Sequence, residues 1–161
     1  MTIVAEKAAT DVGSRDLQRV AELLGGSRVL SRRVISALDV HELILRGLPA
    51  SALDHLVGRL RILHKADSLE KAVGMSVRTY QRRKEAPFKP LSQEQSGRAW
   101  KFAEILAKAS DVFGSQNEAE QWLERPAIGL DGRRPIDLLS TPAGIELVED
   151  YLVRLEYGVY A

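Results

Sequence analysis

The residues best suited to chemistry lie together in a basic stretch near the middle of the sequence. From Ser76 to Lys84 the chain reads Ser-Val-Arg-Thr-Tyr-Gln-Arg-Arg-Lys. Arginine can bind guanine through two hydrogen bonds, glutamine can bind adenine in the same way, and threonine can contact a phosphate or a thymine methyl group. On a helix, this combination of side chains is typical of one that lies in the major groove of DNA.

Two short helices joined at Gly74 must position these side chains, and their spacing is typical of a helix-turn-helix. Gly74 suits the turn because glycine accepts a positive φ without a steric penalty. We expect Leu69 and Val73 to pack the first helix, and Met75 and Tyr80 to hold the second helix from beneath.

If Met75 and Tyr80 point inward, the other side chains of the second helix point outward, where they could contact a partner. Ser76 is its expected N-cap. The candidate DNA-binding residues are Ser76, Val77, Arg78, Thr79, Gln81, Arg82, Arg83 and Lys84. Two residues depart from the usual pattern, because Glu70 stands where a small residue is usual and Arg83 where an apolar anchor is usual. An ordinary basic helix pair is the alternative interpretation.

The charges are unevenly distributed, although the formal net charge is only +1. From Arg59 to Lys89 there are 9 lysines and arginines against 3 acids, whereas from Asp111 onward there are 10 acids against 4 arginines. Such asymmetry indicates that the middle of the chain meets a polyanion and that the end meets something else. Two solvated faces with chance clustering are the alternative.

No residue pattern predicts an enzyme, and we expect neither a cofactor nor a metal. His41-Glu42 is followed by Leu45 where a zinc protease needs its second histidine. His55 and His64 are 9 residues apart, which does not place them on one helical face. No glycine-rich phosphate-binding motif occurs in the sequence.

The composition favours a globular protein of the cytoplasm. Hydrophobic residues make up 45% of the chain, which is enough for a core, and the absence of cysteine is compatible with a reducing compartment. The N-terminus carries Glu6 and Asp11 and has no apolar signal segment. No apolar run approaches the roughly 20 residues of a membrane span.

Apolar residues recur at helical spacing almost throughout, and no alternating run predicts a strand, so we expect an all-α fold. The predicted helix starts, from caps and prolines, are Ser14, Arg32 (for a helix to Leu45), Pro49, Ser92, Ser115 and Thr141. Pro87 and Pro90 mark the best linker. The predicted division is an N-terminal helical extension (1–32), a helix-turn-helix domain (33–90) and a C-terminal domain (91–161).

The C-terminus is unusually apolar. We expect the last helix to finish near Tyr157, with Gly158 after it, and Val159-Tyr160-Ala161 then follow. Free chain ends are generally polar, so an apolar end is stabilised only where something covers it. The cover could be the chain's own core or a partner.

Several motifs follow one another in a fixed order toward the end of the chain. They are Gly74–Lys84, Leu91-Ser92, Val112-Phe113-Gly114, Ala119, Trp122-Leu123, Pro126, Pro135-Ile136-Asp137-Leu138-Leu139, Thr141-Pro142, Gly144, Val148-Glu149 and Glu156–Ala161. In this order and spacing they resemble the Xre/MbcA/ParS antitoxin family. The resemblance covers the chain from about Arg33 onward, and the C-terminal run is its most specific part.

This resemblance implies an all-helical antitoxin, with an Xre-like helix-turn-helix domain followed by a small helical toxin-binding domain. It implies a cognate RES-domain toxin that depletes NAD, with the antitoxin covering the toxin's active-site cleft. Carried over by position, the toxin-binding residues are Arg154, Glu156, Tyr157, Gly158, Val159, Tyr160 and Ala161. The residues expected to shape the domain that presents them are Trp122, Leu123, Pro135 and Leu138.

The resemblance also implies self-association, with a homodimer and a toxin–antitoxin hetero-oligomer as the expected assemblies. Binding of operator DNA through the helix-turn-helix would repress the operon. The alternative function is a helix-turn-helix transcription regulator whose C-terminal domain only dimerises.

Overall fold

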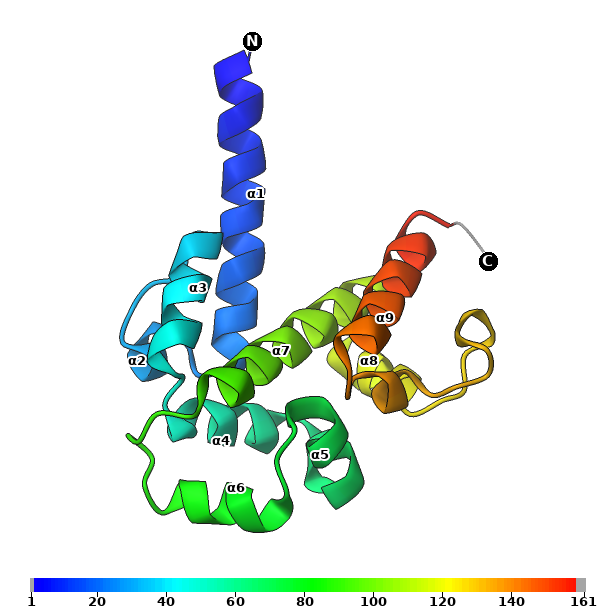
Figure 1. The fold of residues 1–161 in the computed structure, drawn as a ribbon. Coiled ribbons are helices and arrows are strands. Elements are labelled where there is room, and N and C mark those ends of the chain that lie inside the picture. The colour runs from blue at the N-terminus through cyan, green and yellow to red at the C-terminus, as the bar shows by residue number, and fades with distance from the viewer. Residues whose placement is uncertain (1, 159–161) are drawn as a thin grey trace.

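The computed structural model describes the backbone of residues 2–158 and the side chains of residues 13–158. Over this range the fold is all-α, as expected, with two isolated bridges and no sheet. Figure 1 shows the arrangement of the helices. Their bounds are α1 Thr2–Leu23, α2 Gly26–Leu30, α3 Ala37–Arg46, α4 Ala50–Arg59, α5 Ala66–Val73, α6 Val77–Lys84, α7 Gln93–Phe113, α8 Gln116–Leu123 and α9 Pro142–Glu156, with short 3-10 turns η1 Arg61–His64, η2 Ile128–Leu130 and η3 Pro135–Leu138.

Helix α1 stands out from the body of the molecule for most of its length (Figure 1). Its last turns join the core through Val20 and Ala21, and the next buried residue is Leu24. The prediction that this helix starts at Ser14 is wrong, because α1 already begins at Thr2. The Ser14 hydroxyl lies inside the helix and accepts a hydrogen bond from the Gln18 amide at 3.5 Å.

Helix α3 begins at Ala37, five residues later than the predicted Arg32. Ser36 and Asp39 form a capping box, and the Asp39 carboxylate also accepts the backbone N–H of Ile35 at 3.0 Å. These backbone bonds, with those from Ser36, hold the pKa of Asp39 below its usual value. Arg32 instead folds back to pair with Asp39 at 2.8 Å, so the segment before α3 wraps around its N-terminus.

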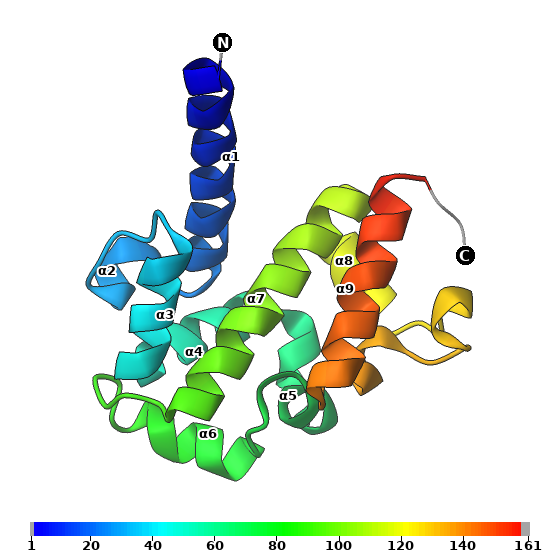
Figure 2. The same ribbon diagram turned by 45° about the horizontal axis from the view of Figure 1, so that its top comes forward.

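Helix α7 is the element against which most of the others pack. It starts in the predicted capping box of Ser92 and Gln95 and ends at Gly114. It contacts α1, α3, α5, α8 and α9, and Figure 2 shows it crossing the molecule between α3 and α4 on one side and α8 and α9 on the other. Trp100 and Phe102, which lie on this helix, are both buried.

The segment between α6 and α7 is pinned to the body rather than suspended from it. The backbone N–H groups of Ala50 and Ser51 donate to the carbonyls of Lys89 and Pro87, at 3.1 and 3.0 Å. The N–H of Leu91 donates to Leu48 at 2.8 Å. The two prolines therefore stop α6 and hold the chain beside the start of α4.

Local caps set the C-terminal helices in place. The Ser115 hydroxyl accepts the backbone N–H of Glu118 at 3.1 Å, and the Thr141 hydroxyl accepts that of Gly144 at 3.0 Å. A Cβ at Gly144 would lie 1.9 Å from the carbonyl oxygen of Leu138, so only glycine lets α9 approach η3 this closely. None of the helices in the described range is long and apolar enough to cross a membrane.

Candidate functional site

Helices α5 and α6 form the predicted helix-turn-helix. Gly74 lies between them with a φ of 70°, and its N–H closes α5 by donating to the carbonyl of Glu70 at 2.8 Å. Leu69, Val73 and Met75 are buried, as the spacing predicted. Glu70 itself is exposed, so its long side chain does not separate the two helices.

Gly74 also makes room for Arg98, a residue that the sequence interpretation missed. A Cβ at Gly74 would lie 2.1 Å from an Arg98 guanidinium nitrogen. That guanidinium donates hydrogen bonds to the backbone carbonyls of Lys71, at 2.7 Å, and Leu139, at 3.4 Å. Arg98 therefore satisfies a carbonyl at the end of α5 and joins the turn of the helix-turn-helix to the segment before α9.

Asp54 of α4 fixes the recognition helix α6 from beneath. The Tyr80 hydroxyl donates a hydrogen bond to the Asp54 carboxylate at 2.5 Å, and the Lys84 ammonium lies 3.5 Å from the same carboxylate. Burial and this carboxylate together raise the pKa of Tyr80 above its usual value, so the hydroxyl stays protonated and keeps donating. Lys84, one of the predicted DNA-binding residues, thus already has a partner within the protein.

The predicted DNA-binding residues differ in how freely they face solvent. The side chains of Arg78, Gln81 and Arg82 are exposed and make no hydrogen bond or ion pair within residues 13–158. Val77 is half-buried against the core rather than fully outward. Arg83 is also half-buried, and its Nε has no hydrogen-bond partner in the described part of the chain.

At the start of α6, Ser76 caps the helix as predicted. Its hydroxyl oxygen accepts the backbone N–H of Thr79 at 3.1 Å and lies 3.0 Å from the Thr79 hydroxyl, to which it donates. This pair fixes the first turn of the helix. The three free side chains Arg78, Gln81 and Arg82 therefore project from a helix whose start and underside are both held.

The end of α9 carries the described part of the predicted toxin-binding segment. Tyr157 is the C-cap and is 76% exposed, and Gly158 follows with a φ of 69°. Arg154 is half-buried, and Glu156 forms an ion pair with Lys108 of α7. The remaining predicted residues, Val159, Tyr160 and Ala161, lie outside the described residues.

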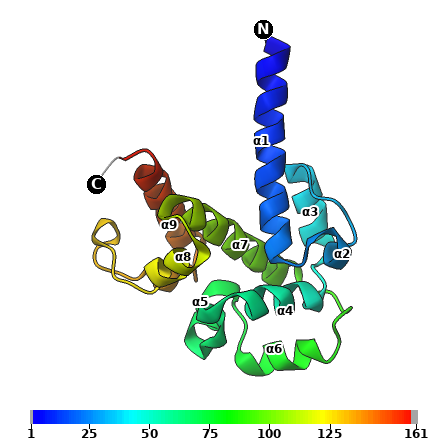
Figure 3. The ribbon, with the colours of Figure 1, turned by 180° about the vertical axis from the view of Figure 1, so that it is seen from behind.

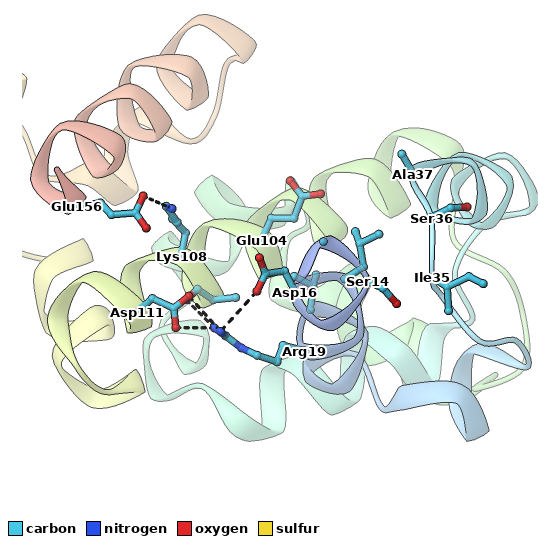
Figure 4. Close-up of a pocket in the computed structure, with 14 residues that line it drawn as sticks. Ser14, Asp16, Arg19, Ile35, Ser36, Ala37, Glu104, Lys108, Asp111 and Glu156 are labelled. Atoms are coloured by element: carbon cyan, nitrogen blue, oxygen red, sulfur yellow. Dashed lines mark hydrogen bonds and ion pairs between the residues drawn. The ribbon is translucent and has the colours of Figure 1, made fainter. Parts of the chain in front are cut away.

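A groove of about 600 Å³ lies beside this helix end, between α1, the start of α3 and α7. Figure 4 shows Glu156 and Lys108 at one end of it and Ile35 at the other. Arg19 reaches from α1 to Asp111 of α7 at 2.9 Å. The cations that line the groove are therefore already paired with carboxylates across it.

A network of ion pairs joins the helix-turn-helix to the C-terminal part. Lys71 of α5 pairs with Asp137 of η3, and the Arg134 guanidinium binds the same carboxylate through two hydrogen bonds of 2.8 and 2.9 Å. Asp67 completes the group, at 3.2 Å from Lys71. Hydrogen bonding from Arg134, followed by that from Lys71, lowers the pKa of Asp137 to about 2.

The two candidate surfaces lie on opposite sides of the molecule. In Figures 1 and 3, α6 forms the lower edge, whereas the end of α9 is at the upper side. The three histidines are each exposed, and they do not form a cluster on either surface. Within the described residues, no group of three metal-ligating side chains comes together.

Asp54, Arg98 and Asp137 position the site, yet sequence reasoning assigned none of them this role. Asp54 is 26 residues from its partner Tyr80 along the chain. Lys71 is 27 residues from Arg98 and 66 residues from Asp137. Hydrophobic periodicity and capping signals concern neighbours within one or two turns, so they carry no information about such pairs.

Comparisons with known proteins match both parts of this structure. Residues 39–104 match the family described as the antitoxin Xre-like helix-turn-helix domain. Residues 108–158 match the antitoxin Xre/MbcA/ParS C-terminal toxin-binding domain. The first match contains α5 and α6, and the second contains α8 and α9.

Relatives that align over about three quarters of the chain agree with these matches. The chain is 30% identical to an "Antitoxin Xre" of Photorhabdus laumondii over 77% of its own length and 82% of the relative. It is also 30% identical to an "Antitoxin Xre" of Pseudomonas putida over 76% and 74%. A "Prs ADP-ribosylating antitoxin" of Sphingobium is 28% identical over 78% and 83%. The chain therefore belongs to the Xre/MbcA/ParS family of antitoxins, with an Xre-like helix-turn-helix domain followed by a C-terminal toxin-binding domain.

Proposed function

We propose that this antitoxin neutralises a RES-domain toxin that depletes NAD, by covering the toxin's active-site cleft with the end of its C-terminal domain. The observation that carries the proposal is the exposed Tyr157, which caps the last helix of the domain matched as toxin-binding. Burial of a large, solvent-exposed aromatic side chain in a partner contributes strongly to the free energy of binding. The covering segment is Arg154, Glu156, Tyr157, Gly158, Val159, Tyr160 and Ala161.

In the same proposal, α6 binds the operator and represses the operon. Arg78, Gln81 and Arg82 are the free side chains with the chemistry for base edges and phosphates. The protein acts by binding rather than catalysis, in the cytoplasm, as a homodimer and in a hetero-oligomer with its toxin. The division into residues 1–32, 33–90 and 91–161 assigns DNA binding to the middle part and toxin binding to the last.

Co-expression with the toxin from the neighbouring gene tests this function. Cells that make the toxin alone should lose NAD and stop growing, and the full-length chain should restore both. A chain that lacks residues 157–161 should restore neither, although it should keep its helical circular-dichroism spectrum. Full protection by the truncated chain would overturn the covering mechanism.

The name of the Sphingobium relative joins ADP-ribosylation to an antitoxin, and it favours a second candidate in which the toxin partner of this chain transfers ADP-ribose to a protein. Both reactions use NAD, but only the transfer leaves ADP-ribose attached to a target. Lysates that contain the toxin and a labelled NAD would show a labelled protein in this case, and the label should disappear when the antitoxin is added. If the neighbouring gene encodes no toxic protein, the alternative of a plain transcription regulator is favoured instead.

A further inference from the structure

Ile128, in the loop between α8 and η3, is 92% exposed. Single apolar residues are common on protein surfaces, so exposure by itself indicates nothing. What distinguishes Ile128 is the way in which its loop is built and the part of the molecule on which the loop sits.

The loop is closed by its own backbone. The N–H of Ala127 donates to the carbonyl of Arg133 at 3.0 Å, and the carbonyl of Ala127 accepts the N–H groups of Leu130 and Gly132 at 3.0 and 2.9 Å. Ala127 and Leu130 are each only 7% exposed. Ile128 therefore projects from a fixed turn whose two flanking anchors are buried.

The next residue, Gly129, seats this turn on the aromatic side chains of the C-terminal domain. A Cβ at Gly129 would lie 2.2 Å from the ring of Tyr151 in α9. That ring stacks on Trp122, with 6.2 Å between the ring centroids, and Trp122 lies 5.1 Å from Phe113. A loop held in this way loses little conformational entropy when a partner covers it, which favours its use as a binding anchor.

The loop lies beside α9, the helix that carries the start of the predicted toxin-binding segment. Figures 1 and 3 both show η2 standing next to α9. Tyr151, which Gly129 touches, precedes Tyr157 by six residues, or about 9 Å along a helix. A single partner surface of about 800 Å² covers such a span with ease. Leu147, one turn before Tyr151 on the side away from Tyr157, is 51% exposed and adds apolar area to the same helix.

We propose that Ile128 is a second anchor for the toxin, separate from the C-terminal segment. Its side chain fills a small apolar pocket beside the toxin's cleft. This proposal rests on the proposed function. Arg125 and Arg133 flank the loop and are both exposed, against one exposed acid, Asp131. The surface of the toxin around its pocket should therefore be acidic.

Toxin affinity of the full-length chain, measured by titration calorimetry, tests this anchor. Truncation in Ile128→Ala should weaken binding about ten-fold, and Ile128→Glu, which would bury a charge, by more than a hundred-fold. The matched control is Leu45→Glu, at a residue of α3 that is 54% exposed and far from this domain in the sequence. It should leave the affinity unchanged.

The outcomes separate this proposal from the function on which it rests. If the wild-type chain binds the toxin and both Ile128 variants bind equally well, the anchor is overturned and the proposed function stands. If the wild-type chain does not bind, both are overturned. If Ile128→Glu instead changes the mass of the toxin-free antitoxin while the toxin affinity is kept, the loop is a self-association surface and the proposal is wrong. If Ile128→Glu lowers the Tm of the antitoxin, the toxin affinity of Ile128→Ala decides whether Ile128 is an anchor.

Discussion

The recognition helix α6 and the last helix α9 face solvent with different chemistry. None of the residues of α6 is fully buried, and its free side chains are the cations Arg78 and Arg82 with Gln81 between them. Helix α9 buries Val148 and Leu152 in the core and ends in an exposed aromatic residue. Helix α6 is placed on the molecule by polar contacts to Asp54 and by the half-buried side chains of Val77 and Tyr80, whereas α9 is part of the core.

This difference indicates two modes of recognition in one small protein. A cationic helix attracts a polyanion over long distances, and its affinity falls steeply with salt because bound counterions are released. An apolar helix end binds by burial, which salt affects little. The two surfaces should therefore respond to different substitutions and to different solution conditions.

The largest effect is expected at the end of α9. Deletion of residues 157–161 removes the exposed Tyr157 and the apolar residues that follow it in the sequence. Loss of such a cluster should weaken toxin binding by at least about a hundred-fold, as hot-spot residues do. Surface plasmon resonance with immobilised toxin measures this, and operator binding by the same truncated chain should be unchanged. A truncated chain that lost both activities would contradict the separation of the two surfaces.

On the other surface, Arg78→Ala combined with Arg82→Ala should lower operator affinity by about ten- to a hundred-fold. It should also reduce the slope of log K against log salt by about 1 to 2, because one or two phosphate contacts are lost. Fluorescence anisotropy at several salt concentrations measures both quantities. The charge-matched control is Arg28→Ala, in α2, combined with Arg33→Ala, just after it; both residues are exposed, and the slope should stay constant. An equal loss in the control would mean that net charge alone drives binding.

The junction between the two regions should be sensitive at Gly74. Alanine there would adopt an unfavourable positive φ and meet the Arg98 guanidinium, so Gly74→Ala should lower the free energy of unfolding by roughly 2 to 3 kcal/mol. Gly114→Ala is the matched control, since Gly114 has a φ of 92° with nothing within 4 Å. This control should lower the free energy of unfolding by roughly 1 kcal/mol. Urea denaturation of both variants measures the two costs. Equal costs would show that Arg98 does not constrain the turn.

The smallest effect is expected from the ion pairs that tie α5 to η3. The pKa of Asp137 is lowered to about 2, so its stabilising effect is present above the unfolded value near 3.8 and is lost as the pH falls toward about 2. Because the side chain is one-third exposed, Asp137→Asn should cost only about 1 kcal/mol at neutral pH and much less at about pH 2, where about half of the folded molecules carry a protonated Asp137. Urea denaturation at both pH values measures the difference, with Asp150→Asn as the exposed control. A loss of the same size at pH 2 as at neutral pH would point to packing rather than charge.

Much of the fold could be predicted from the sequence because its signals are local. The capping serine Ser92 with Gln95, the Thr141 cap and the turn glycine Gly74 all act on residues within one helical turn. The buried anchors Leu69 and Met75 follow from the same short spacing. Such interactions are encoded by neighbouring residues, so the sequence pattern is sufficient to find them.

The rest could not be predicted, for two physical reasons. The start of α1 at Thr2 has no strong cap or periodic face before Ser14, so the pattern placed the helix too late. The supports of the site are long-range contacts, as with Asp54 beneath Tyr80 and Arg98 beside Gly74. Neither contact has a signature in sequence spacing, and only the packed structure brings these residues together.

The central claim is that toxin and operator bind to opposite sides of one antitoxin. It is tested most directly by adding an equimolar amount of toxin to the antitoxin already bound to operator DNA, and measuring the mass of the complex by size-exclusion chromatography with light scattering. Separate surfaces predict a ternary complex whose mass is that of the DNA complex plus the toxin. Release of free DNA, with toxin and antitoxin eluting together without it, would contradict the account.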